Sequence, residues 1–414
     1  MIIGIDIGSH KIVALMGEGL PGGGVRVVGA GHAPAEGIRA GEVVSVEDAA
    51  GAIGACVERA ERLAGDTFDS AVIGVTGAHV VGTANRAAVP CGRRPRPMDA
   101  TDVERVLEVA GTVPVEPERE VLHVLPRSYR LDGGSAVDSP VGMEGFRLEA
   151  EVHIVTGSLG AFNTVRRCLK LADIDRYRLV MSTLAAAEAT VTPDERELGV
   201  VVVDLGHALT GVACFADGAI VHTATLKIGG KHLTNDLAVL FQTPFDQAER
   251  LKKTHGHVLP EHDDDRAEVD IVPFGEEQVR SVRRRDVSRV LAARADEMAS
   301  MILAEIERAG FGDHPPAGVV LVGGGTELKG LPHRLQESWR VPVRVGRPTQ
   351  VAGLTNAAKS PDHAAAVGLL MWAVRGVPDA AVPNVSTNGH AVPLGGMFGW
   401  MRETLLPRRD GRRG

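Results

Sequence analysis

Two short segments of the chain place an aspartate just ahead of a glycine turn. Asp6 precedes Gly8 and Asp204 precedes Gly206, and each pair lies between two apolar runs. Backbone N–H groups in such a turn can converge on phosphate oxygens because no Cβ stands in the way. The aspartates can hold a hydrated Mg²⁺ beside the phosphates, and Lys11 can add a positive charge. These residue types in this order predict a phosphate and Mg²⁺ site.

A single Asp-x-Gly turn is more often structural than functional, but here the turn is duplicated. Residues 199–206 repeat the design of residues 1–8, and a returning apolar run follows each of them. A third glycine turn, at 323–326, follows the buried run 318–322. Two equivalent hairpins in a repeated chain therefore favour a binding site that both halves share.

The elements that position these turns follow from the pattern of apolar residues. We expect strands at 2–6, 11–16, 70–77, 199–206, 210–215 and 318–322, and helices from Ser45 to Gly65 and from Ser158 to Leu171. Between 82 and 155, prolines surround strands near 121–131 and 146–155 and one helix that Thr101 and Glu104 are expected to cap. This stretch is predicted to be an inserted α+β module.

The end of the chain has a different texture. Residues 377–393 are rich in proline and small polar residues, which is typical of a linker. Beyond them, one helical face carries bulky apolar side chains, and five arginines stand against two acidic residues from 395 to the end. The pattern predicts an amphipathic helix on an anionic membrane surface, and the alternative is a helix that packs on the body of the protein. The residues expected to contact the membrane are Leu394, Met397, Phe398, Trp400, Met401, Leu405, Arg408 and Arg409.

Composition excludes several classes of protein. The 414 residues carry a net charge of −8, so no global basic field attracts nucleic acid, and no nucleic-acid partner is expected. The four cysteines are far apart, which fits neither a zinc site nor a disulfide-bonded secreted domain and favours a reducing compartment. No apolar run reaches the roughly 18 residues of a membrane span. Any membrane contact is therefore expected to be peripheral.

Three motifs of the sequence resemble those of a known superfamily. DIGSHK at 6–11, VVDLGHALTG at 202–211 and LVGGGTELKG at 321–330 resemble the phosphate-1, phosphate-2 and adenosine motifs of the actin/Hsp70/sugar-kinase superfamily. Longer segments, such as GIRAGEVVSVEDA and LKIGGKHLTNDLA, resemble the FtsA family of bacterial cell-division proteins over nearly the whole chain. The resemblance implies an α/β, actin-like two-domain fold of duplicated ribonuclease-H-like halves. It adds an inserted α+β subdomain in the first half and a C-terminal amphipathic helix.

The resemblance also implies subdomain limits. The first actin-like subdomain takes 1–82 and 158–197, around the insertion at 83–157. The second takes 198–226 and 286–376, around a small subdomain at 227–285 that closes over nucleotide, before the linker 377–393 and the tail 394–414.

ATP and Mg²⁺ are the cofactors that the resemblance implies, with Mg²⁺ held through water by Asp6 and Asp204. The phosphates would meet Gly8, Ser9, His10 and Lys11 on one side and Gly206 and Thr210 on the other. The adenosine would lie on Gly323, Gly324, Gly325 and Thr326, and the ribose and adenine side would be lined by Gly229, Gly230, Asn235, Glu249 and Lys252. Without the resemblance, Glu249 and Lys252 would be interpreted as an exposed helical charge pair.

Two departures from the family pattern concern hydrolysis. The second turn, 206–211, lacks two of the glycines and the trailing acid that family members commonly carry. The stretch 181–185, where relatives place a water-orienting side chain, offers no carboxylate or carboxamide, and Glu188 is the nearest candidate. We therefore expect a nonenzymatic protein in which any ATP hydrolysis is slow and nucleotide acts as an assembly ligand.

The function implied is an actin-like, polymerising adaptor that tethers FtsZ filaments to the inner face of the cytoplasmic membrane during septum assembly. Its partners would be the C-terminal peptide of FtsZ, further copies of itself, an anionic membrane surface and other divisome proteins, with Arg283, Arg284 and Arg285 near the peptide. The protein would be peripheral, at the division site. The alternatives are a PilM-like pilus-assembly adaptor, which would lack the amphipathic tail, and a small-molecule kinase, which would need a catalytic base in the cleft.

Overall fold

The computed structural model describes residues 1–22, 24–112, 116–264, 266–275, 278–312, 314–353 and 358–375. The predicted linker, 377–393, and the predicted amphipathic tail, 394–414, lie outside these ranges. Within the described part of the chain, no helix is both long enough and apolar enough to cross a membrane.

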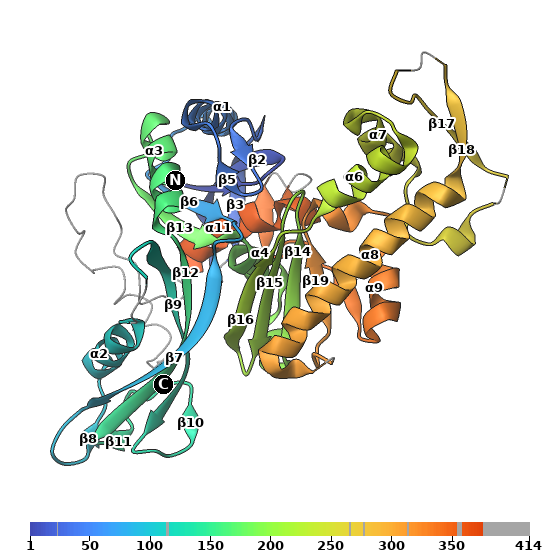
Figure 1. The fold of residues 1–414 in the computed structure, drawn as a ribbon. Helices are drawn as coiled ribbons and strands as arrows, with labels where there is room; N and C mark the ends of the chain where they lie inside the picture. The colour runs from blue at the N-terminus through green and yellow to red at the C-terminus, as the bar shows by residue number, and fades with distance from the viewer. Residues whose placement is uncertain are drawn as a thin grey trace, which may run out of the picture.

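A six-stranded sheet organises the first half of the chain (Figure 1). Its order is β13 (Tyr177–Met181), β6 (Ser70–Val75), β1 (Ile2–Ile7), β2 (Lys11–Gly19), β3 (Val25–Pro34) and β21 (Val351–Gly353). β2 is antiparallel to β1 and β3, whereas β6 is parallel to β1 and to β13. The central strands β1, β2 and β6 are mostly buried on both faces because helices cover the sheet, α1 (Val46–Ala64) on one side and α11 (Ala364–Arg375) on the other.

The predicted ends of two helices of this half are confirmed. The side chain of Ser45 accepts a hydrogen bond from the backbone N–H of Asp48 at 3.4 Å, and Gly65 ends α1 in the left-handed conformation with φ of 70°. Ser158 caps α3 (Leu159–Leu171) by accepting from the backbone N–H of Ala161 at 3.3 Å. Local cap chemistry is sufficient to set these boundaries.

A five-stranded sheet organises the second half. Its order is β16 (Ala219–Leu226), β15 (Thr210–Ala216), β14 (Val200–Leu205), β19 (Val319–Val322) and β20 (Val343–Val345). β14 is antiparallel to β15 and parallel to β19, just as β1 is antiparallel to β2 and parallel to β6. The predicted internal repeat is therefore confirmed. Helices α8 (Arg284–Ile306) and α9 (Leu331–Trp339) pack against this half.

Helix α4 (Ser182–Thr190) joins the two halves. All nine of its residues are buried, and it contacts β6 and β13 of the first sheet as well as β14 and β15 of the second. It also packs along α11, and α5 (Pro193–Leu198) then leads the chain into β14. The strand ends that carry Asp6 and Asp204 are thus held on either side of one buried helix.

The inserted module extends away from the first sheet as a separate lobe (Figure 1). Its four-stranded sheet has the order β10 (Ala136–Val137), β9 (Arg119–Leu131), β12 (Arg147–Ser158) and β7 (Val81–Pro90). The module also contains α2 (Ala100–Gly111) and the short pair β8 (Arg96–Pro97) and β11 (Glu144–Gly145). It contacts the second half as well, because His153 Nε2 lies 2.9 Å from Thr223 Oγ1 on β16.

The predicted cap of α2 is wrong. The N-cap is Asp99, whose side chain accepts from the backbone N–H of Asp102 at 3.0 Å, while the side chain of Asp102 accepts from the backbone N–H of Asp99 at 3.2 Å. Thr101 and Glu104 lie inside the helix, after its N-cap, so they do not cap it. Two such patterns occur two residues apart, and the first is accompanied by further side-chain contacts of Asp102.

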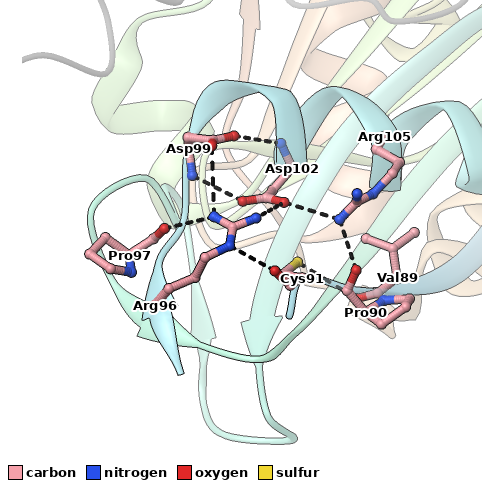
Figure 2. Close-up of polar contacts among 8 residues, drawn as sticks. All are labelled: Val89, Pro90, Cys91, Arg96, Pro97, Asp99, Asp102 and Arg105. Atoms are coloured by element: carbon pink, nitrogen blue, oxygen red, sulfur yellow. Dashed lines mark hydrogen bonds and ion pairs between the residues drawn. The ribbon is translucent and has the colours of Figure 1, made fainter. Parts of the chain in front are cut away.

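Those contacts converge on the carboxylate of Asp102 (Figure 2). It is only 2% exposed, and it accepts hydrogen bonds from Arg96 Nη2 at 2.7 Å and Arg105 Nη2 at 3.0 Å. Arg96 Nε also donates to the carbonyl oxygen of Cys91 at 2.7 Å, and Arg105 Nη2 donates to that of Pro90 at 2.8 Å. One buried carboxylate therefore ties the start of α2 to the segment between β7 and β8.

Replacing Asp102→Asn should lower the free energy of unfolding by about 1–3 kcal/mol at neutral pH, because two guanidinium donors lose a charged acceptor. Burial alone would raise the pKa of Asp102, but the hydrogen bond from Arg96 lowers it below its usual range. A depressed carboxyl pKa contributes stability above about pH 4, which is lost as the pH falls through the folded-state value. Denaturant unfolding of Asp102→Asn and of the exposed control Asp138→Asn should differ at pH 7 and converge in acid. Equal stabilities at pH 7 would contradict this role.

The small subdomain consists of α6 (Gly230–Phe241), α7 (Phe245–His255) and the hairpin of β17 (Glu268–Ile271) and β18 (Arg280–Arg283). It projects from the second sheet on the side away from the inserted module (Figure 1). The remaining described elements are the pair β4 (Ile38–Arg39) and β5 (Glu42–Val43) and the short helical turns η1 (Pro260–His262), η2 (Glu307–Phe311), η3 (Gly324–Glu327) and η4 (Pro361–His363).

Candidate functional site

A cavity of about 550 Å³ lies between the two halves, at the turns that follow β1, β14 and β19. Its size is within the range of small-molecule sites. Most of the predicted nucleotide residues line it, namely Asp6, Gly8, Ser9, His10, Lys11, Asp204, Gly206, Gly230, Glu249, Lys252, Gly323, Gly324 and Gly325. The fold therefore brings together residues from both halves and from the small subdomain.

Four predicted residues do not line the cavity: Thr210, Gly229, Asn235 and Thr326. The hydroxyl of Thr210 is buried and donates to the carbonyl oxygen of Ile228 at 2.8 Å. The hydroxyl of Thr326 donates to the carbonyl oxygen of Gly323 at 2.8 Å, within its own turn. Gly229 is the N-cap of α6, and Asn235 lies further along that helix. Thr210, Thr326 and Gly229 thus belong to the elements around the cavity, and Asn235 is exposed on α6.

The two hairpin turns have the same geometry. A Cβ placed on Gly8 would lie 2.7 Å from the carbonyl oxygen of Lys11, and one placed on Gly206 would lie 2.8 Å from that of Leu209. Neither distance leaves room for a side chain, because real Cβ atoms do not approach an oxygen so closely. Both turns therefore require glycine, and both direct a tight backbone turn at the cavity from opposite halves.

Asp6 and Asp204 face this cavity from the ends of β1 and β14. Burial and, second to it, the negative charge of Asp6 together raise the pKa of Asp204 to about 7. Burial also raises the pKa of Asp6, although the hydroxyl of Ser182, which donates to Asp6 Oδ1 at 2.8 Å, opposes this effect. Gly323 has φ of 84°, and a Cβ there would lie 2.5 Å from Asp204 Oδ1. The two carboxylates thus repel each other, and position 323 beside Asp204 has no room for a side chain.

Lys11 forms an ion pair with Asp362, which also lines the cavity. Asp362 belongs to η4, and the carbonyl oxygen of the preceding Pro361 accepts from the backbone N–H of Gly323 at 2.9 Å. The imidazole Nδ1 of His363 lies 2.9 Å from the other carboxylate oxygen of Asp362. The first hairpin is thereby linked to the third glycine turn, and Lys11 already has an anionic partner.

Glu249 and Lys252 form a partly buried ion pair at 2.7 Å and not an exposed helical pair. Lys252 Nζ also donates to the carbonyl oxygen of Gly230 at 3.0 Å and to the hydroxyl of Thr234 at 2.7 Å, which fixes α7 to the start of α6. Burial would raise the pKa of Glu249, but its hydrogen bonds with Lys252 and Thr234 lower it to about 2. The start of α6 in turn docks on the second hairpin, because the N–H of Gly230 donates to the carbonyl oxygen of Gly206 at 3.0 Å.

Several residues that line the cavity were not predicted: Thr76, Ser182, His207, Lys253 and Asp362. His207 lies in the second turn, and its position next to Gly206 could have been used to predict that it lines the cavity. Ser182 directly follows β13, which ends beside the strand end of β6. Asp362 reaches Lys11 across 351 residues of sequence, and no local pattern marks such a pair.

Glu188, the nearest candidate for orienting a water molecule, is not in the cavity. Its side chain is 8% exposed and is bound by Arg196 at 2.7 Å and Arg375 at 3.4 Å. It lies on the buried helix α4, two turns beyond Ser182. Glu188 is therefore not placed for that role, and it holds α4 to α5 and α11 instead.

The three arginines predicted near a partner lie at the junction of β18 and α8, away from the cavity. Arg283 is exposed and is the N-cap of α8. Arg284 forms an ion pair with Asp263, with Nε 3.1 Å from Oδ1, and Arg285 is half-buried in the first turn of the helix. Of the three, Arg283 is the side chain most open to solvent.

Comparisons with known proteins agree with this arrangement. The family profile described as "Cell division protein FtsA" matches residues 201–368, and the one described as "SHS2 domain inserted in FTSA" matches residues 77–156. The cell division protein FtsA of Pseudomonas aeruginosa is 35% identical over 391 residues, which cover 94% of this chain and 93% of the relative.

Solved structures share the fold at much lower identity. A PilM-PilN type IV pilus biogenesis complex matches with a TM-score of 0.62 at 18% identity, covering 90% of this chain and 98% of that chain. MreB5 of Spiroplasma citri bound to ADP matches with a TM-score of 0.53 at 11% identity, covering 90% of this chain and 95% of that chain. At such identities the likeness shows an actin-like fold alone.

The pilus-assembly alternative rests on this shared fold, whereas the similarity to FtsA extends to sequence identity along nearly the whole chain, inserted domain included. The chain therefore belongs to the FtsA family of cell-division proteins.

Proposed function

We propose that this chain binds ATP with Mg²⁺ between its two halves and, as a polymer, tethers FtsZ filaments to the inner face of the cytoplasmic membrane at the division site. The nucleotide part rests on one observation, the cavity into which two equivalent glycine hairpins and their aspartates face. The ADP in the similar fold of MreB5 supports it. We also propose the subdomain limits that the resemblance to FtsA implied in the sequence analysis.

The residues of the cavity fit Mg²⁺ and a polyphosphate. Asp6 and Asp204 are oxygen ligands on opposite halves, and the raised pKa of Asp204 reflects burial and then the neighbouring negative charge of Asp6. A hydrated divalent cation would offset that repulsion, and Mg²⁺ prefers carboxylates reached through its water shell. The hairpin turns at Gly8 and Gly206 would place backbone N–H groups near the phosphates. In this role the cation neutralises phosphate charge.

We further propose a nonenzymatic role in which hydrolysis is far slower than a typical enzyme turnover of about 10 per second. Two observations support this. Glu188 is held by two arginines outside the cavity, and the side chain at the start of α4, Ser182, donates its hydroxyl to Asp6. Neither is placed to orient a water molecule for attack.

The membrane and partner contacts are proposed from the sequence and the family. The apolar face of 394–405 would enter the headgroup region, and the arginines after it would favour anionic lipid. The exposed Arg283 at the edge of the small subdomain would meet the C-terminal peptide of FtsZ. We also propose that the chain associates with copies of itself and with further divisome proteins. Self-association would strengthen membrane attachment, because many weakly binding tails bind tightly when they are linked in one polymer.

Reconstitution tests this function directly. The full chain with ATP should carry FtsZ into the pellet with vesicles that contain phosphatidylglycerol, and it should not do so with neutral vesicles. Arg283→Glu should reduce the FtsZ that pellets several-fold without changing the amount of adaptor on the vesicles. The matched control is Arg289→Glu, an exposed arginine one and a half turns further along α8. If FtsZ stays in solution while the adaptor pellets, the tethering function is wrong.

A further inference from the structure

Two histidines face each other across the cavity. His10 belongs to the turn of the first hairpin and His207 to the turn of the second, so each half contributes one imidazole. Their ring centroids are 5.0 Å apart and the rings are tilted by 32°. Both side chains line the cavity, His10 at its exposed mouth and His207 half-buried. The tips of the two hairpins thus end in a pair of nitrogen-bearing rings that approach from opposite sides.

We propose that His10 and His207 form a two-sided clamp that selects nucleoside di- and triphosphates over monophosphates. Binding of such a nucleotide would be accompanied by protonation of the two imidazoles. The inference rests on the proposed nucleotide function and extends it. An imidazole N–H donates to a phosphate oxygen, and a protonated imidazole adds a positive charge to that hydrogen bond. Two rings on opposite turns can engage one phosphate group from two sides, which a single residue cannot do.

The charges around the clamp explain why protonation would follow the ligand. In the protein alone, burial and then nearby lysines lower the pKa of His10. Burial, then the charge of His10 and nearby lysines, lower the pKa of His207 to about 4. Glu249 opposes them for both rings. The groups that face His10 are Lys253, Glu249, Lys11 and Lys252, and those that face His207 are His10, Glu249, Lys252 and Lys231.

Near neutral pH both rings are therefore uncharged, and two uncharged rings can lie this close without repulsion. A bound polyphosphate brings several negative charges next to them, which raises an imidazole pKa. A group whose pKa is higher in the complex than in the free protein takes up a proton on binding, so affinity increases as the pH falls toward the bound value. Each such proton contributes up to about tenfold in affinity per pH unit.

Titration calorimetry of the full chain with ATP and Mg²⁺, in PIPES and in ACES buffer at equal pH, measures the protons taken up. The test variant is His10→Asn with His207→Asn, because asparagine keeps a donor but does not titrate in this range. The protons of ATP and of Asp204 contribute equally to both proteins and cancel in the difference. The matched control is His333→Asn, an exposed histidine on α9.

The wild type should take up roughly half a proton or more per ATP beyond the double variant near pH 7. From about pH 8 to about pH 6.5 it should gain about three- to tenfold more ATP affinity than the double variant, while AMP shows no such difference. If the double variant does not fold, as judged by its thermal transition, His207→Gln alone should lose part of the uptake.

The possible failures are distinct. If the wild type and the double variant, or the single variant in its place, bind ATP with the same proton uptake, the clamp is wrong while nucleotide binding stands. If the wild type binds no ATP under conditions in which it is folded, both the clamp and the proposed nucleotide function are wrong. An equal pH dependence for AMP and ATP would also overturn the clamp, because the effect would not depend on the terminal phosphates.

Discussion

Gly8→Trp is expected to weaken ATP binding by more than about 100-fold, which corresponds to a loss of about 2.7 kcal/mol. A Cβ at this position would lie 2.7 Å from the carbonyl oxygen of Lys11, and the indole would extend toward the cavity that the turn lines. The phosphates and the ring cannot share that space. Calorimetry with ATP and Mg²⁺ on the purified full chain measures the change.

The same substitution strains the hairpin, so two further variants separate strain from obstruction. Gly324→Trp also enters the cavity, but a Cβ there meets nothing closer than 3.8 Å, at the Cβ of Asp362. It should weaken ATP binding strongly while the thermal transition changes little. Gly51→Trp is the control, because it lies on the exposed face of α1 with open space around it. Unchanged ATP affinity in both cavity variants would exclude this cavity as the nucleotide site.

The parts of the fold that sequence predicted well are those fixed by neighbours in the chain. The hairpins at Asp6 and Asp204 follow from an apolar run, a glycine turn and a second run, all within about a dozen residues. Ser45 and Gly65 set the ends of α1 through bonds to adjacent residues. In α2, the cap falls on Asp99 and not on Thr101 two residues later, and the carboxylate of Asp102 in that cap is also bound by Arg96 and Arg105.

The candidate site shows the same division. The turns that line the cavity were predicted because glycine and aspartate mark them locally, but the partners of their side chains were not. Lys11 pairs with Asp362, and Asp6 accepts from Ser182, through contacts that span 351 and 176 residues. Thr210 and Thr326 were predicted to contact nucleotide because each belongs to a matched motif. In the structure, the hydroxyl of each donates to a backbone carbonyl oxygen instead. A motif predicts where a turn lies and does not predict which way each side chain points.

The tail gives the second large effect. Phe398→Glu combined with Leu405→Glu should release the protein from anionic vesicles even at low salt, because two charges would enter the apolar layer. Burying a large apolar side chain fully contributes about 1.5–3 kcal/mol, and partial immersion contributes less. Each arginine near an anionic surface contributes about 1 kcal/mol, and salt screens that contribution. Cosedimentation with vesicles over a range of salt concentrations measures the apolar and the electrostatic contributions to binding.

The matched control reverses the charge at Arg408 and Arg409 and leaves the apolar face intact. It should weaken binding only in part, chiefly on anionic lipid at low ionic strength. ATP affinity should be unchanged in both variants, since the residues that line the cavity come from 6–362 and the segment 377–393 separates them from the tail. If the double glutamate variant cosediments at wild-type levels, the apolar face does not hold the protein on the membrane. The tail would then act by packing on the body of the protein, and the attachment of filaments would need another surface.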